Sequence, residues 1–151
     1  MISLPLSSKK TITMPARDIY HNTVKNALIK DEWVITHDPL SLKWGKKDMY
    51  VDLGAKQLLA AEKTERKIAV EVKSFTGNSE MTDLERAVGQ YIVYNDVLLQ
   101  VEPKRLLYLA VAEEVAQGLF EEPLGQLLLN NNRIRLLVFN PVSEAIVQWI
   151  P

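Results

Sequence analysis

The feature that most constrains the fold of this chain is a near-continuous apolar run at residues 106–111, LLYLAV. Such a run is typical of a β-strand that is buried on both of its faces. A strand of this kind needs a layer of structure on each side of its sheet. The 151 residues suffice for one domain with one sizeable core. We therefore predict a single-domain α/β fold in which helices flank a mixed central sheet.

The remaining hydrophobic pattern predicts the element order α-β-β-β-β-α-β-α-β-β. Helices are expected over residues 18–30, 81–100 and 113–129. Asp18 is the expected N-cap of the first helix, and Pro123 and Gly125 are expected to break the third. Strands are expected over residues 33–37, 49–51, 57–61, 67–73, 106–111, 134–139 and 144–149. The domain is expected to span residues 14–151, after a loose extension over residues 1–13.

Composition excludes several classes of function. The chain has no cysteine, which rules out disulfides, thiolate metal sites and a cysteine nucleophile, and which fits a reducing cytoplasm. Its formal net charge is -1, so any contact with DNA must come from a local basic patch. No apolar run is long enough to cross a bilayer, and the start lacks the apolar core of a secretory signal. We expect a cytoplasmic protein with no membrane segment.

The stretch that is most informative about chemistry is residues 69–74, AVEVKS. Side chains alternate along a strand, so Glu71 and Lys73 point to one face while Val70 and Val72 point to the other. If the preceding hairpin brings Asp52 beside Glu71, two carboxylates and one ammonium group converge. Ordinary solvated charges on a sheet would give the same tripeptide. The apolar strand, the upstream aspartate and the helix that follows favour a metal site.

A divalent ion such as Mg²⁺ or Mn²⁺ suits this set of groups. Magnesium prefers hard oxygen ligands and is commonly held by one or two carboxylates together with a substrate phosphate. Asp52 and Glu71 are the expected ligands, with the backbone carbonyl of Val72 as a third. Lys73 is expected to orient the attacking water or to neutralise charge on the phosphate. Asp48 is the alternative metal-binding aspartate, because it lies four residues before Asp52 on the same expected strand face.

Other polar residues carry weaker expectations. Glu62 could reach the site from a strand end, although a solvated charge at the end of a hairpin explains it better. His21 is a second candidate for the site, and its alternative is a packing or surface histidine. Lys43, Lys46 and Lys47 flank an aromatic residue in an expected loop, where they could contact a DNA backbone or simply face solvent.

These motifs together resemble a known family. Asp52 followed by Glu71-x-Lys73, after one helix and before another, is similar to the PD-(D/E)xK nuclease superfamily. More closely, the segments PARDIYH at 15–21, YVDLG at 50–54, AVEVKSF at 69–75 and VQWIP at 147–151 resemble the XisH-like family. The founding members of that family are controlling factors for excision of a bacterial DNA element.

The resemblance implies a PD-(D/E)xK endonuclease-like fold and a role in DNA excision beside a site-specific recombinase and a small partner protein. It implies that Glu71 and Lys73 are the (D/E)xK pair, and that Gln90 and Tyr94 form a helical motif that positions water or DNA. Val51 stands where many superfamily members have proline, and His21 stands where many have a glutamate. The rival expectation is a non-catalytic accessory that keeps the fold and binds a partner protein or DNA ends. By analogy of fold, a homodimer is expected.

Overall fold

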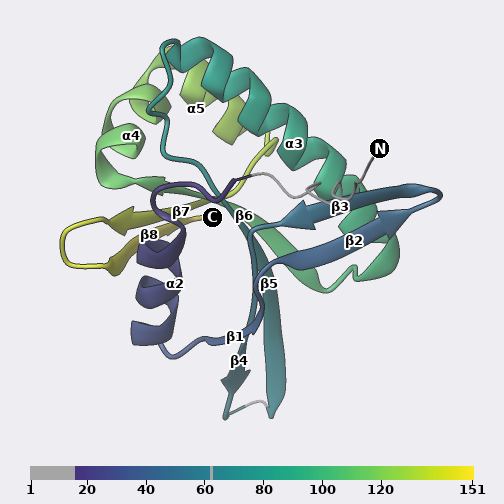
Figure 1. Ribbon diagram of the computed structural model, residues 1–151. Helices are drawn as coiled ribbons and strands as arrows, with labels where there is room; N and C mark the ends of the chain where they lie inside the picture. The colour runs from purple at the N-terminus through teal and green to yellow at the C-terminus, as the bar shows by residue number, and fades with distance from the viewer. Residues whose placement is uncertain (1–15, 62) are drawn as a thin grey trace, which may run out of the picture.

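The computed structural model describes residues 16–61 and 63–151 and confirms a single mixed α/β domain (Figure 1). The expected extension over residues 1–13 and the candidate Glu62 lie outside the described residues. The helices are α2 (His21–Lys30), α3 (Glu80–Val101), α4 (Glu113–Gln117), the 3₁₀ turn η1 (Leu119–Glu121) and α5 (Pro123–Asn130). The strands are β1 (Val34–His37), β2 (Leu40–Trp44), β3 (Lys47–Val51), β4 (Leu53–Leu59), β5 (Thr64–Val72), β6 (Arg105–Ala112), β7 (Leu136–Asn140) and β8 (Ala145–Ile150).

The central sheet has six strands in the order β1-β4-β5-β6-β7-β8. Strands β5, β6 and β7 run parallel, whereas β1, β4 and β8 are antiparallel to their neighbours, so the predicted mixed sheet is confirmed. Strand β6, which contains the apolar run that was expected to be buried, lies between two parallel neighbours. Alternate residues of β6 enter two separate clusters of buried side chains, one on each face of the sheet.

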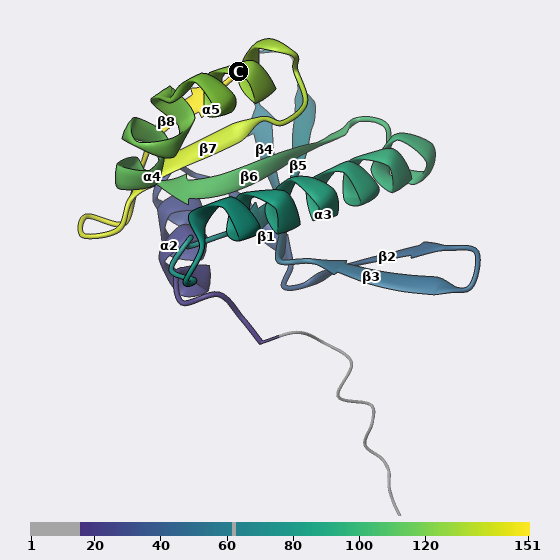
Figure 2. The same ribbon diagram turned by 90° about the horizontal axis from the view of Figure 1, so that it is seen from above.

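The two faces of the sheet are covered by different helices (Figures 1 and 2). Helix α2 packs on the face where Val24 and Leu28 join Tyr108 and Phe139. Helix α3 packs on the opposite face, where its residues Leu84 and Tyr91 belong to the other buried cluster. Helices α4 and α5 lie on the same side as α3 (Figure 1). No helix in residues 16–61 and 63–151 is both long enough and apolar enough to span a membrane.

The structure corrects three local expectations. The first helix begins at His21 rather than at 18, and Tyr20, not Asp18, is its N-cap residue. Gly54, expected to separate two strands, lies within β4, where an added Cβ would come to 3.0 Å from Nδ1 of His37. The expected loop that contains Lys43, Lys46 and Lys47 is the antiparallel hairpin β2–β3.

This hairpin forms its own two-stranded sheet and projects from the body beside the end of α3 (Figure 2). Its base is fixed because Leu40, Leu42 and Val51 are buried in the cluster that α3 covers. Its tip turns through two residues, Gly45 and Lys46, and Gly45 has a φ of 61°. A positive φ at the first position of a two-residue hairpin loop favours glycine.

Candidate active site

Two carboxylates meet where the chain passes from β3 into the central sheet. The backbone N–H of Asp52 donates to Oε1 of Glu71 at 3.1 Å. In return, Oδ2 of Asp52 accepts from the backbone N–H of Val72 at 2.7 Å. These reciprocal hydrogen bonds bring together residues that are 19 positions apart in the chain. We refer to Asp52 and Glu71 as the carboxylate pair.

The strand pattern explains why the pair forms here. Strand β4 pairs with β5 from Leu53 opposite Val70, so Asp52 is the residue just before the ladder begins. Its side chain takes the N–H of Val72, beyond the last residue that β4 pairs with. Glu71 points to the same face of β5 as Ala69, because side chains alternate along a strand. Ala69 belongs to the cluster under α3, so Glu71 projects toward α3.

Burial and mutual repulsion give this pair unusual protonation. Burial, the larger cause, and the charge of Asp52 together raise the pKa of Glu71 to about 9. Burial also raises the pKa of Asp52, although the N–H of Val72 opposes this rise. The two acids shift each other in opposite directions, because Glu71 lowers the pKa of Asp52 and Asp52 raises that of Glu71, so Glu71 is the member that takes up a proton first.

Residues of α3 complete this side of the site. Burial and the charges of Glu71 and Asp52 together raise the pKa of Tyr94 to about 12. Tyr94 therefore lies within the electric field of the pair. Lys73 leaves β5 on the same face as Glu71, and its Nζ lies 3.8 Å from Oδ1 of Asp83. In the part of the chain that the structure describes, no ion pair joins a cation to either member of the carboxylate pair.

Three further carboxylates near the site were not singled out by sequence reasoning as functional residues. Asp18 accepts from the backbone N–H of Ser74 at 2.9 Å, and its charge raises the pKa of Asp52. Asp83 accepts from the N–H of Gly77 and faces Lys73. Asp38 is the centre of a cluster of cations. Nothing in the local pattern around these residues signals such contacts, because each is a single acidic residue near a helix start or a strand end.

The Asp38 cluster consists of Asp38, Arg17, His21 and Lys25. Oδ1 of Asp38 lies 2.7 Å from Nε2 of His21 and 3.3 Å from Arg17, while Oδ2 lies 2.7 Å from Lys25. Burial alone would raise the pKa of Asp38, but hydrogen bonds and charges from Lys25 and His21 lower it below its ordinary value. His21 is buried, and its Nδ1 has no hydrogen-bond partner among the described residues. The charge of His21 lowers the pKa of Asp52.

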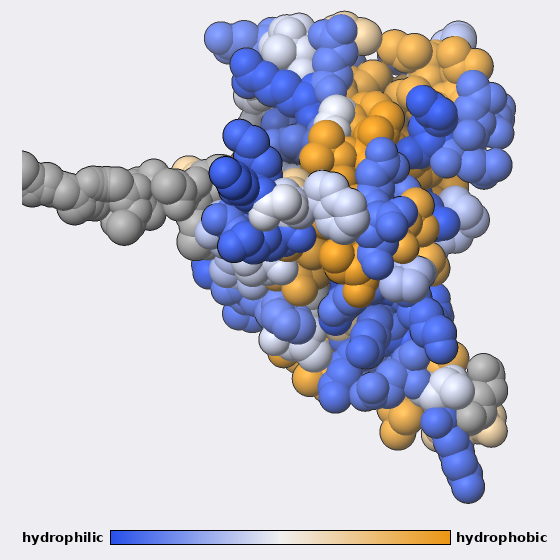
Figure 3. Space-filling model, turned by 90° about the vertical axis from the view of Figure 1, so that its right-hand side faces the viewer, coloured by the Kyte–Doolittle hydropathy of each residue, from blue (hydrophilic) through white to orange (hydrophobic). Residues whose placement is uncertain are grey.

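The other predicted site residues form no hydrogen bond or ion pair with the carboxylate pair within the described residues. Asp48 is exposed on β3, in register with Lys43, and no hydrogen bond or ion pair among residues 16–61 and 63–151 joins it to the pair. Gln90 is exposed on α3, one turn before Tyr94. Lys43, Lys46 and Lys47 are exposed on the β2–β3 hairpin. The side of the molecule that carries this hairpin has large hydrophilic areas around hydrophobic ones (Figure 3).

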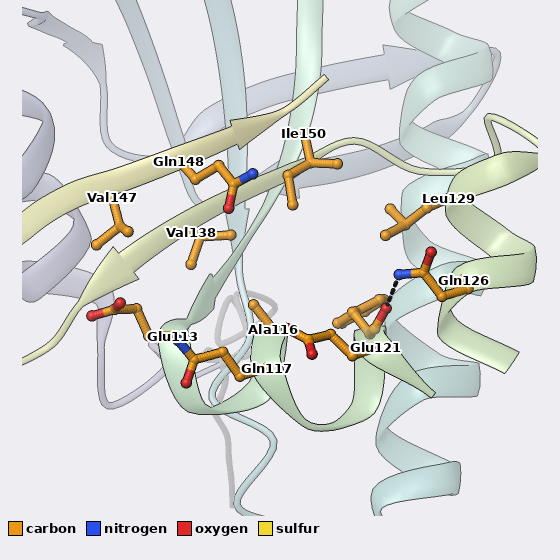
Figure 4. Close-up of a pocket in the computed structure, with 11 residues that line it drawn as sticks. Glu113, Ala116, Gln117, Glu121, Gln126, Leu129, Val138, Val147, Gln148 and Ile150 are labelled. Carbon is orange, nitrogen blue, oxygen red and sulfur yellow. Dashed lines mark hydrogen bonds between the residues drawn. The ribbon is translucent and has the colours of Figure 1, made fainter. Parts of the chain in front are cut away.

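Two concavities lie away from the carboxylate pair. One, of about 250 Å³, opens between β7–β8 and the α4–η1–α5 segment, and side chains such as Val138 and Gln148 face Glu113 and Gln117 across it (Figure 4). The other, of about 450 Å³, is lined by Trp44 of the hairpin and by residues 93–100 of α3. Neither is lined by Asp52 or Glu71.

The donor set fits a hard divalent cation that keeps most of its own waters. No group of three or more His, Cys, Asp or Glu side chains gathers into a metal site in the described part of the chain. This excludes a closed protein cage built from the described residues alone, such as a structural zinc site. Two carboxylates held at one point match the Mg²⁺ or Mn²⁺ pattern, in which water and substrate phosphate complete the coordination.

Comparison with known proteins places this geometry in context. A family model described as XisH protein matches residues 14–147. The crystal structure of an XisH family protein from Nostoc punctiforme is similar, with a TM-score of 0.80 and 36% identity over 89% of this chain and 100% of that chain. The crystal structure of an fdxN element excision controlling factor protein from Anabaena variabilis has a TM-score of 0.81 and 38% identity, with the same coverage. Among curated proteins, no sequence matches the chain.

Proposed function

The chain belongs to the XisH family, and from this premise we propose that it acts on DNA during excision of a genetic element, as a divalent-metal-dependent endonuclease-like protein. The Anabaena relative is named an excision controlling factor, which supports the excision role. The carboxylate pair is the observation that carries the nuclease part of the proposal. It is a half-buried pair of acids that accept backbone hydrogen bonds at one point of the sheet, with no cation at ion-pair distance within the described residues.

The proposed site follows the arrangement of the PD-(D/E)xK nucleases. Asp52 and Glu71 would hold Mg²⁺ or Mn²⁺, with the backbone carbonyl of Val72 as a further ligand. Such an ion would polarise a phosphodiester and lower the pKa of the attacking water. Lys73 would neutralise charge that develops on the phosphate. Gln90 and Tyr94, on the helix that faces the pair, would contact the water or the DNA.

Contact with DNA would come from a local surface rather than from bulk charge. The net charge is -1, so the three exposed lysines of the β2–β3 hairpin are the proposed contacts to the phosphate backbone. The proposed partners are a site-specific recombinase and a small protein of the excision system, and the proposed assembly is a homodimer.

The direct test is cleavage of supercoiled and branched DNA in the presence of Mg²⁺ or Mn²⁺. We expect the wild-type chain to nick or cut at least one of these substrates, and Glu71→Gln to remove the activity. Asp48→Asn is the matched control, because it removes an exposed carboxylate from the neighbouring strand β3. Activity that survives Glu71→Gln would come from a contaminant, and loss of activity in Asp48→Asn would move the metal site to that residue.

A second function, that of a non-catalytic accessory, is favoured by one observation. The chain is slightly acidic, with a sequence pI of about 6.1, which is unusual for a protein that must grip DNA alone. In this case the fold would bind a partner protein or DNA ends and cut nothing. Binding of DNA in the absence of partners, together with metal-dependent cleavage, would exclude this function.

A further inference from the structure

We propose that Asp83 is a positioning residue for Lys73: it holds the lysine ammonium group beside the carboxylate pair, so that the pair stays free to take a divalent cation. This inference rests on the metal-binding role proposed above for Asp52 and Glu71. It assigns to a buried carboxylate of α3 a task that the chemistry of the pair itself does not include.

The position of Lys73 is the first step. Lys73 and Glu71 leave β5 on the same face, so a lysine side chain can reach either the pair or the start of α3. Its Nζ lies 3.8 Å from Oδ1 of Asp83, and no ion pair among the described residues joins it to Glu71 or Asp52. Asp83 is thus the one anion at ion-pair distance from Lys73 among the described residues.

Asp83 is held firmly in place. It is only 7% exposed, and its Oδ2 accepts from the backbone N–H of Gly77 at 3.0 Å. It lies in the first turn of α3, where the helix dipole stabilises a negative charge. Ser79 caps this turn by accepting from the N–H of Thr82. Asp83 therefore joins the loop after Lys73 to the helix that covers the site.

Gly77 makes this position possible. An added Cβ at Gly77 would come to 2.8 Å from both carboxylate oxygens of Asp83, closer than real Cβ atoms approach other atoms. The obstacle is the end of a short side chain rather than backbone, so alanine at 77 would push the carboxylate aside and leave the core intact. The three atoms nearest to that Cβ all belong to Asp83, so the carboxylate is what favours glycine at 77.

The consequence concerns competition for the pair. An ammonium group within about 4 Å of a partly buried carboxylate is strongly attracted to it. If Lys73 lay on the pair, a divalent cation would have to displace it before binding. Asp83 offers the ammonium group another anion, which leaves the pair open to a divalent cation.

The first test uses crystal structures of the metal-free full-length chain and of Asp83→Asn. Asparagine keeps the oxygen that accepts from Gly77 but removes the charge that attracts Lys73. We expect Nζ of Lys73 to move from position 83 to within hydrogen-bonding distance of Glu71 or Asp52 in the variant. A lysine that keeps its wild-type position would overturn the inference, whether or not the protein binds metal or cuts DNA.

The second test is a calorimetric titration with Mn²⁺. We expect Asp83→Asn to weaken Mn²⁺ binding by about tenfold, on the scale of an ammonium group that must be displaced from carboxylates. In a Lys73→Met background the same substitution should have no effect, because the competing ammonium group is gone. Equal weakening in both backgrounds would mean that Asp83 acts only through its charge or the fold, and would refute a positioning role. A wild-type chain that binds no Mn²⁺ would refute the proposed function instead, and the crystal structures would still decide the inference.

The glycine provides a matched pair of variants. Gly77→Ala should weaken Mn²⁺ binding in the same direction as Asp83→Asn, because it displaces the carboxylate. Gly89 lies on the exposed side of α3, the helix that carries Asp83, and a Cβ added there would have no atom within 4 Å. Gly89→Ala should therefore leave Mn²⁺ binding unchanged. Identical binding by the two alanine variants would contradict the part given to Gly77 and Asp83.

Discussion

The carboxylate pair and the Asp38 cluster are both acidic centres, and they differ in what surrounds the acid. Asp38 has Arg17, His21 and Lys25 within ion-pair distance, and Lys25 and His21 lower its pKa despite its burial. The carboxylate pair has no such cation within the described residues, and burial with mutual repulsion raises the pKa of Glu71 to about 9.

The contrast separates an acid whose charge the fold balances from a pair of acids that, under our proposal, bind a divalent cation. Asp38 joins α2 to the end of β1, and the fold itself provides the opposing charge. Within the described residues, Asp52 and Glu71 accept backbone hydrogen bonds but form no ion pair, and the charges of His21 and Lys73 act on them only from beyond ion-pair distance. Strongly shifted pKa values are found at functional sites more often than elsewhere.

The strongest way to break the comparison is to remove one acid of the pair. Glu71→Gln should weaken Mn²⁺ binding by more than about a hundredfold, beyond the loss typical of outer-shell residues, because Glu71 is an expected direct ligand. Asp38→Asn, in an acid whose charge is already balanced, should leave Mn²⁺ affinity within about threefold. Isothermal titration at one pH measures both. Equal losses in the two variants would show that the pair has no special affinity for the metal.

Glu71 and Asp38 should also have opposite effects on the stability of the fold in the absence of metal. The folded-state pKa of Glu71 lies above its ordinary value of 4.5, so its contribution to stability is full below about pH 4.5 and is lost as the pH rises toward about 9. Glu71→Gln should therefore raise the free energy of unfolding at pH 8 by about 2–3 kcal/mol.

Asp38 follows the opposite sign. Its folded-state pKa is lowered, so its contribution is present above its ordinary value of 3.8 and is lost as the pH falls. Asp38→Asn should lower the free energy of unfolding at neutral pH by about 2 kcal/mol, between the values for exposed and buried ion pairs. Urea denaturation of both variants at several pH values provides the measurement. Destabilisation by both substitutions at pH 8 would contradict the assigned protonation of the pair.

Metal binding should be coupled to the proton on Glu71. Because that proton must leave before two carboxylates can ligate a cation, Mn²⁺ affinity should rise by up to about tenfold per pH unit between pH 6 and pH 9. About one proton should be released per ion bound, which titration in buffers of different ionisation enthalpy would measure. Affinity that does not change over this range would mean that the pair is already fully ionised.

The sequence predicted the parts of the molecule that depend on periodicity. Alternation along β5 is confirmed, because Val70 and Val72 belong to the cluster under α2 while Ala69 belongs to the cluster under α3, and the helix predicted over residues 81–100 is α3 (Glu80–Val101). The part of the hairpin from Lys43 to Lys47 was taken for a loop, although residues 40–44, LSLKW, alternate apolar with polar side chains, whereas the strand predicted over 49–51 lies within β3. Only packing of its buried residues under α3 distinguishes it from a solvated loop.

The contacts around the pair join residues that are far apart in the chain, and local sequence patterns do not predict such contacts. Asp18 is 56 residues from Ser74, whose N–H it accepts, and Arg17 is 21 residues from Asp38. The role of Gly77 appears only when its missing side chain is compared with the position of Asp83. The pairing of Asp52 with Glu71 was expected because a hairpin and strand alternation suffice to bring them together.

The smallest expected effect concerns the lysines of the hairpin. The cations of the Asp38 cluster are paired with an acid, whereas these lysines form no ion pair within the described residues. No ion pair joins Lys43, Lys46 or Lys47 to a carboxylate in the described chain, so all three are free to neutralise phosphates. Replacing all three by alanine should weaken metal-free DNA binding, and should reduce the slope of log affinity against log salt by about 3, close to one unit for each phosphate that a lysine no longer neutralises. Lys25→Ala removes a cation that Asp38 already neutralises and should leave that slope unchanged. If Lys25→Ala changed the slope as much as a single hairpin lysine does, the DNA surface would lie on the α2 face instead, and the division between balanced and available charges would not hold.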